Sequence, residues 1–133
     1  MAPLTIYLGL DKKVPSIDHH NYFLRNNFKE YSSKLYRNQI SLDQPYYYVN
    51  VVSRYNSNAA PEGGEALYIL VPVPDRRFRP DWEDKQAIAD SIISDLSGRI
   101  GFDIGPHIVS RTVLSPVDWE AMLDLHRGSG LGL

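Results

Sequence analysis

Hydrophobic and polar positions recur along the chain with periods that predict five strands and three helices. Runs that alternate every second residue, or that are apolar throughout, are typical of strands, whereas apolar positions three or four apart are typical of helices. Strands are expected at residues 4–10, 22–24, 46–53, 66–71 and 107–113, and helices at about 27–36, at 82–100 and from 115 onwards. This order predicts an α+β fold with a mixed, largely antiparallel sheet and helices packed against it.

Two of the strands differ in their pattern. Residues 46–53 place Tyr47, Val49 and Val51 on one side and Tyr48, Asn50 and Val52 on the other, which is the period of a strand. Residues 66–71 are apolar without alternation, as expected of a strand in the middle of a sheet. Pro72 and Pro74 are expected to end that strand, because proline has no backbone donor for the ladder.

The helices carry their own signals. Apolar residues recur every three to four positions between Trp82 and Ile100, which predicts an amphipathic helix. Ser115, Pro116 and Asp118 are typical of a helix start, with Asp118 returning a hydrogen bond to the cap. Gly128 is expected to supply the left-handed residue that stops this last helix.

Length and composition restrict the class of protein. The 133 residues suit one domain, taken as residues 1–133, and the net charge of −2 comes from scattered charges, which argues against a nucleic-acid partner. The chain has no cysteine, so it has no disulfide and no thiolate chemistry. Its longest apolar stretch, residues 66–74, is too short to span a membrane, so a cytoplasmic protein is expected, with peripheral membrane contact left open.

The candidate polar residues do not form a familiar catalytic motif. The four histidines, at 19, 20, 107 and 126, lack the i, i+4 helical spacing of a zinc site, and no metal is expected. His19 and His20 either line a cavity as hydrogen-bond donors or lie at a surface and a strand edge. Arg54, which follows a strand, either binds an anion or forms a structural salt bridge. The glycines at 128–132 follow a helix, so they do not form a dinucleotide loop.

The two ends of the chain suggest a piece of a larger fold. A strand is expected almost at the first residue, and the sequence stops within a glycine-rich segment. Complete domains usually finish with polar termini that are tied down. We therefore expect a partial domain without a complete active site of its own.

Nine short blocks together resemble the carotenoid desaturases, the phytoene desaturases and their diapophytoene-type bacterial relatives. Their shared order and spacing cover nearly the whole chain. The blocks are His19-His20-Asn21, Phe23-Leu24, Tyr48-Val49 with Ser53-Arg54, residues 60–63, residues 66–74, Asp81-Trp82, residues 107–109, residues 115–119, and residues 126–129 leading into Gly132. Arg127-Gly128-Ser129 departs from the pattern, because relatives commonly pass from the aromatic or His position straight to glycine.

The resemblance implies a flavoenzyme that desaturates a long isoprenoid hydrocarbon and binds FAD through a glycine-rich loop that is not among these residues. These residues would form the substrate side of a larger FAD-dependent, amine-oxidase-like fold, with no FAD bound to them alone. Residues 46–48 and 66–71 would line an apolar tunnel, although at least half of their side chains are expected to be ordinary core.

The resemblance assigns no catalytic residue. The polar groups expected nearest the flavin or the polyene are His126, Ser129 and Arg54, followed by His19 and His20. Two alternatives stay open: a stand-alone module that binds apolar ligands without redox activity, and a related FAD-dependent carotenoid isomerase or oxygenase.

Overall fold

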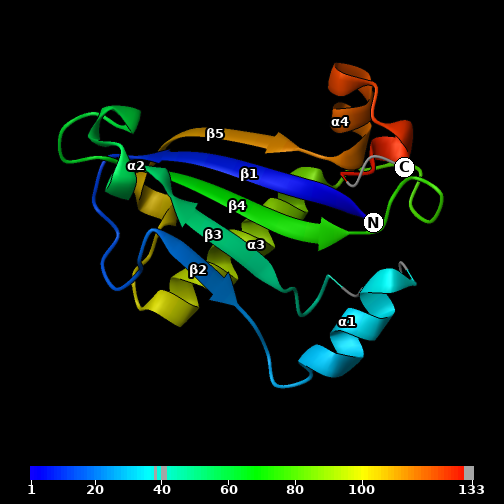
Figure 1. The fold of residues 1–133 in the computed structure, drawn as a ribbon. Helices are drawn as coiled ribbons and strands as arrows, with labels where there is room; N and C mark the ends of the chain where they lie inside the picture. Colours follow the sequence, from blue (N-terminus) through cyan, green and yellow to red (C-terminus); the bar gives the residue numbers. More distant parts are fainter. Residues whose placement is uncertain (38, 40–41, 131–133) are drawn as a thin grey trace.

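The computed structural model describes residues 1–37, 39 and 42–130, which form one five-stranded sheet with helices around it (Figure 1). The strands are β1 (Ala2–Leu10), β2 (His20–Phe23), β3 (Tyr47–Val51), β4 (Glu65–Val73) and β5 (Ile108–Leu114). The helices are α1 (Phe28–Tyr36), α2 (Val52–Tyr55), α3 (Lys85–Ile100) and α4 (Pro116–Leu123). The described residues also form three 3₁₀ turns: η1 (Ser57–Ala59), η2 (Gly105–His107) and η3 (His126–Gly128).

The strands lie in the order β2-β3-β4-β1-β5, and every neighbouring pair is antiparallel. This confirms the α+β class predicted from the sequence. The strand that is apolar throughout, β4, lies in the middle of the sheet as expected.

One face of the sheet packs against α3, which crosses behind the strands in Figure 1. Alternate residues of the strands point to this covered face, and the apolar positions of α3 meet them, because both periods place their apolar residues on one side. The buried contacts come from Leu4, Ile6, Leu8, Val49, Val51, Leu67, Ile69 and Val71 of the sheet and from Ile88, Ala89, Ile92, Ile93 and Leu96 of α3.

Polar contacts tie α3 to β3 and to β5, on either side of β4 and β1. The Tyr47 hydroxyl of β3 donates to Asp95 (2.6 Å), and Arg111 of β5 donates to Asp90 (2.6 Å). Burial and the bond to Asp95 raise the pKa of Tyr47, so the hydroxyl stays protonated as a donor. The helix is therefore fixed against the sheet by contacts on both sides of β4 and β1.

Two boundaries differ from the prediction. Pro72 does not end β4, which runs to Val73, because β3 pairs with β4 only up to Leu70 and the partner of Pro72 on β1 is another proline, Pro3. A missing donor at the end of a ladder is tolerated.

The last helix also ends earlier than expected. Ser115 and Asp118 start α4 as predicted, with the Ser115 amide donating to Asp118 (2.7 Å). However, α4 stops at Leu123, and Asp124 supplies the left-handed residue (φ 54°). Gly128 serves a close approach instead, since a Cβ there would lie 2.2 Å from the Pro116 carbonyl oxygen.

Among the described residues, no helix is both long and apolar enough to cross a bilayer. Helix α1 lies beside the sheet in Figure 1, and it is attached through Tyr31, whose ring stacks on Tyr46 (centroids 3.8 Å apart). Neither α1 nor α3 covers the second face of the sheet.

Candidate functional site

The candidate site is the face of the sheet opposite α3, called here the open face. Its members are the strand residues that alternate with the buried ones, as the pairing of the strands shows. They are Pro3, Thr5, Tyr7 and Gly9 of β1; Ala66, Tyr68, Leu70 and Pro72 of β4; Tyr48 and Asn50 of β3; His20 and Tyr22 of β2; and Ser110, Thr112 and Leu114 of β5.

The open face carries no Asp, Glu, Lys or Arg on any of the five strands, all of which lie within the described residues. A sheet face in contact with water is normally polar and often charged. Burial raises the pKa of Tyr68, and the neighbouring phenols Tyr7 and Tyr48 add to the shift, so this hydroxyl also stays neutral. The face is therefore uncharged but not buried in a core of its own.

Aromatic rings form a row across four strands of the open face. The Tyr7 and Tyr68 rings lie 5.2 Å apart, Tyr68 and Tyr48 lie 6.4 Å apart, and Tyr48 and Tyr22 lie 5.2 Å apart. These separations are within the range in which aromatic rings attract one another. Tyr22 is 73% exposed and Tyr7 is 38% exposed, so the row presents ring surface to whatever lies against the sheet.

The segment after β5 covers one end of this face. Gly130 lies against the Pro3 ring, where a Cβ would come within 3.0 Å, and Ser129 donates to the Met1 carbonyl (3.3 Å). Thr5 lies at this end and is 1% exposed although it points away from α3. An apolar pocket of about 160 Å³ lies beside it, between Pro3, Leu70 and Pro72.

A larger groove of about 410 Å³ occupies the other half of the open face. Gly9 and Ala66 are paired residues of β1 and β4, and together they form a low floor. Tyr7 and Tyr68, the next open-face pair along the same strands, rise beside it. The groove therefore arises because a row with the smallest side chains of the face lies next to a row with the largest.

Polar groups gather at the β2 edge of the open face. The Tyr48 hydroxyl accepts from the Asn50 amide (3.0 Å) and lies 2.6 Å from His20 Nδ1. The Tyr48 hydroxyl therefore joins the side chains of β2 and β3 at this edge. The His19 ring lies between those of His20 (4.0 Å) and Tyr55 (5.6 Å), and extends the ring system beyond the sheet.

The five polar residues predicted from the sequence fall into two groups at opposite ends of the sheet (Figure 1). His19, His20 and Arg54 lie at the end where β1 finishes, whereas His126 and Ser129 lie beside its start. They do not converge on one point, and of the five only His20 belongs to the open face.

Arg54 is engaged by a carboxylate of the chain itself. Its guanidinium lies 3.3 Å from Glu65 Oε2, and it also donates to the Val14 carbonyl. Glu65 is fully buried and accepts from Ser53 (2.7 Å) and from the Val14 amide (2.9 Å). Burial works to raise the pKa of Glu65, but these donors outweigh it and hold the pKa below its ordinary value. The network ties the loop after β1 and helix α2 to the start of β4.

His126 is exposed on η3, and Ser129, which is 8% exposed, holds the segment after η3 against the start of β1 through the bond to Met1. Gly128 lies between them and packs on the Pro116 backbone. Their contacts in the structure position the segment that covers the end of the open face.

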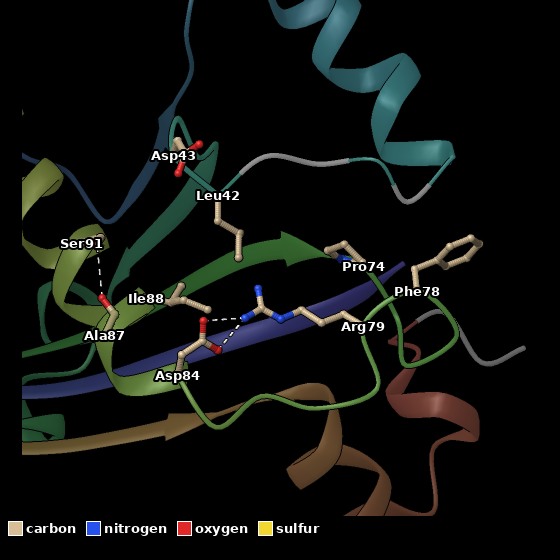
Figure 2. A pocket seen from close by; sticks show the side chains of 9 residues that line it. All are labelled: Leu42, Asp43, Pro74, Phe78, Arg79, Asp84, Ala87, Ile88 and Ser91. Carbon is tan, nitrogen blue, oxygen red and sulfur yellow. Dashed lines mark hydrogen bonds and ion pairs between the residues drawn. The ribbon is translucent and has the colours of Figure 1, made fainter.

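A second hollow, of about 620 Å³, lies on the α3 side between the loop after β4 and the helix (Figure 2). Two pairs of its polar groups are bonded: Arg79 pairs with Asp84 (2.6 Å), and Ser91 donates to the Ala87 carbonyl (3.1 Å). The Arg79 guanidinium also lies 4.4 Å from the centre of the Trp82 ring. Arg79 is therefore already paired within the chain, and the hollow lies at the surface between packed elements.

Within the described ranges, no three His, Asp or Glu residues approach closely enough to hold a metal ion. The chemical character of the candidate site is therefore that of a neutral, aromatic and partly grooved surface. Such a surface can hold an apolar molecule and exclude water from it.

No family model matches the chain. Individual proteins do match along almost all of it. A phytoene desaturase of Cercospora nicotianae is 29% identical over 99% of the chain, and a zeta-carotene-forming phytoene desaturase of Myxococcus xanthus is 33% identical over 96%. A 4,4'-diapophytoene desaturase (4,4'-diaponeurosporene-forming) of Staphylococcus aureus is 32% identical over 96%.

The chain is thus related along nearly its whole length to the carotenoid desaturases, and the resemblance predicted from the sequence is confirmed. It spans about a quarter of the length of these curated relatives: 27%, 25% and 27% in the three cases. The relatives are named as desaturases, so the proteins to which this chain is similar are enzymes.

The open face was only partly predicted from the sequence. Of the two segments expected to line a tunnel, Tyr48, Ala66, Tyr68 and Leu70 lie on it, whereas Tyr47, Leu67, Ile69 and Val71 lie in the core. Tyr7 and Tyr22 were not singled out. The signal that could have found them is the lack of charge at alternate positions of every predicted strand.

Proposed function

We propose that the chain is the substrate-side segment of an FAD-dependent desaturase that acts on a linear isoprenoid hydrocarbon of the phytoene or diapophytoene type. The observation that carries the proposal is the open face, which is aromatic, uncharged and uncovered over most of its area. The names of the relatives support the substrate class, since they include both phytoene and diapophytoene desaturases.

The role of the open face follows from the chemistry of such a substrate. A hydrocarbon has no hydrogen-bonding group, so it can be held only by shape and by the removal of apolar surface from water. A rigid sheet whose second face is fixed by α3 provides a wall of defined shape. Such a wall keeps water away and holds the reacting carbons in a constant position relative to the oxidant.

The described residues do not fit the FAD itself. A dinucleotide site of the expected kind needs a glycine-rich turn within a parallel β-α-β unit, whereas the described strands are antiparallel throughout. The start of α4, directly after β5, is filled by the carboxylate of its own Asp118. FAD, if it serves this enzyme, is held by other residues. Purified chain is expected to show no flavin absorbance, and stoichiometric bound FAD would contradict this assignment.

The proposal that the open face binds the hydrocarbon is tested with lycopene, a linear polyene. Lycopene is delivered to the purified chain from phosphatidylcholine vesicles. A polyene held against a chiral protein surface acquires circular dichroism in its visible band. We expect the signal with the native chain and its loss in Leu70→Asp, which places a charge on the open face. Leu123→Asp is the matched control, because Leu123 is 58% exposed on α4 and does not belong to the open face.

Two results would contradict the wall: no visible dichroism with the native chain, or an equal signal with folded Leu70→Asp. The far-ultraviolet spectrum of each variant shows whether the variant is folded. Leu123→Asp must retain the signal for the loss in Leu70→Asp to count as support.

The enzymatic part is tested in a chimera. The aligned segment of the Myxococcus xanthus enzyme, which is 33% identical over 133 aligned residues, is replaced by this chain. We expect the chimera to convert phytoene into coloured or ultraviolet-absorbing products, measured by chromatography of pigment extracts. A folded chimera that retains flavin yet leaves phytoene unchanged would contradict the proposal.

A further inference from the structure

The groove on the open face is formed by one row of small side chains that runs across the strands. Ser110, Gly9 and Ala66 are direct neighbours on β5, β1 and β4, and Val52 follows at the end of β3. Four strands at the usual spacing make this row roughly 14 Å long. The next row, two residues along each strand, lies about 7 Å away.

That next row forms a wall. Thr112, Tyr7, Tyr68 and Asn50 are its members, and they all line the groove. The Tyr7 and Tyr68 rings tilt against each other at 47° with centroids 5.2 Å apart, so they support one another. The two rings therefore bound the groove on one side and the small side chains form its floor, which suits an unbranched or methyl-branched chain lying across the strands.

The floor depends on the lack of a side chain at residue 9. A Cβ on Gly9 would lie 2.4 Å from Ser110 Oγ, so any larger residue would displace that hydroxyl or fill the floor. The depth of the groove thus depends on Gly9, Ala66 and Ser110 all being small. Each of them is on the open face and does not contribute to the core under α3.

We propose that this row determines the specificity of the open face: it holds one segment of a linear isoprenoid hydrocarbon across β5, β1 and β4, with the Tyr7 and Tyr68 rings against its side. This inference rests on the proposed function, from which it takes the hydrocarbon as occupant. It adds the direction of the chain on the sheet and names residues 66 and 110 as those that limit its thickness.

The test uses substitutions that fill the groove with apolar atoms. If the open face were an apolar surface without a groove that selects by shape, Ser110→Leu and Ala66→Leu would bind lycopene as well as the native chain or better, because both add apolar area. If the groove holds the polyene, both weaken binding by roughly tenfold or more, as expected when a methylene-sized misfit enters an apolar pocket. The readout is the titration of visible circular dichroism with lycopene from phosphatidylcholine vesicles.

Two matched variants complete the design. Ser57→Leu makes the same change at an exposed serine of η1 outside the groove, and it is expected to bind lycopene like the native chain. Ser110→Ala removes the hydroxyl without filling the floor and is expected to bind equally well or more tightly. Thermal melts verify that each variant is folded.

The outcomes separate the two proposals. Lycopene binding that weakens in both fillers and persists in Ser57→Leu supports the groove. Binding that is unchanged or stronger in both Ser110→Leu and Ala66→Leu refutes the role proposed for the groove, but it leaves intact the proposal that the open face binds the hydrocarbon. Absence of lycopene binding by the native chain refutes the proposal that the open face binds the hydrocarbon, and with it the role proposed for the groove.

Discussion

The two faces of the sheet come from the same strands, yet they differ in burial and in the kinds of side chain they carry. On the covered face, alternate residues meet α3 and are almost fully buried, and the few polar groups there are bonded in pairs such as Tyr47 with Asp95. On the open face, the intervening residues are uncharged but remain partly exposed. Burial explains the apolar character of the first face and does not explain that of the second.

The proposed role of the open face in binding would account for this difference. A partly exposed position gains little stability from being apolar, and it carries a risk of aggregation. An entire face without charge is the feature that the proposed hydrocarbon substrate requires. The substrate class in that proposal is taken from the names of the relatives, which are phytoene and diapophytoene desaturases.

The largest loss of stability is expected from a substitution in the covered face. Ile92 of α3 is 0% exposed within the core. Ile92→Ala removes buried methyl groups and leaves a cavity, so the free energy of unfolding is expected to fall by about 4 kcal/mol. Urea denaturation followed by circular dichroism measures the change. A loss below 1 kcal/mol would show that α3 is not packed on the sheet as described.

The buried carboxylate comes next. Glu65→Ala removes the acceptor of bonds from Ser53 and Val14 and the partner of Arg54. We expect a loss of about 3 kcal/mol, since breaking a buried pair leaves its donors unsatisfied. The same denaturation measurement applies, and Glu62→Ala at an exposed nearby carboxylate should change the free energy of unfolding by less than about 0.5 kcal/mol. Equal effects of the two variants would refute the role of the network.

Acidification should act through the same residue. The pKa of Glu65 in the fold lies below its ordinary value of 4.5, so its contribution to stability is complete above that pH and is lost as the pH falls through the folded pKa. Thermal midpoints are therefore expected to fall more steeply below pH 4.5 in the native chain than in Glu65→Gln. Parallel curves for the two proteins would contradict the lowered pKa.

The smallest effect on stability is expected in the open face. Tyr7→Thr keeps a residue that favours strands and loses the ring contact with Tyr68, which should cost about 1 kcal/mol. Lycopene binding should nevertheless decline markedly, because the wall of the groove is removed. Stability that falls as far as in Ile92→Ala would mean that the open face is part of the folding core.

The sequence predicted the covered face better than the open one. The apolar spacing between Trp82 and Ile100 identified α3, and the lack of alternation in residues 66–71 placed β4 in the middle of the sheet. These patterns are local, and local periodicity is what a sequence displays directly. Pro72 misled the prediction of the strand end because its pairing with Pro3 is a tertiary fact.

The candidate site depends on register, which the sequence does not display. Tyr7 and Tyr68 become neighbours only because β1 pairs with β4 in one particular alignment. The same alignment places Gly9 beside Ala66 and Ser110 and so creates the groove. Conversely, His126 and Arg54 were grouped by their polar chemistry, and the fold separates them to opposite ends of the sheet (Figure 1).

The most direct test of the central claim is to map polyene contact onto the tyrosines by NMR. Chain with isotope-labelled tyrosine is titrated with lycopene from phosphatidylcholine vesicles, and single Tyr→Phe variants assign the ring signals. We expect the signals of Tyr7, Tyr48 and Tyr68 on the open face to shift, while those of Tyr46 and Tyr47, which are buried, stay unchanged. Unchanged signals for the open-face tyrosines, or equal shifts in both sets, would contradict the claim that this face is where the hydrocarbon lies.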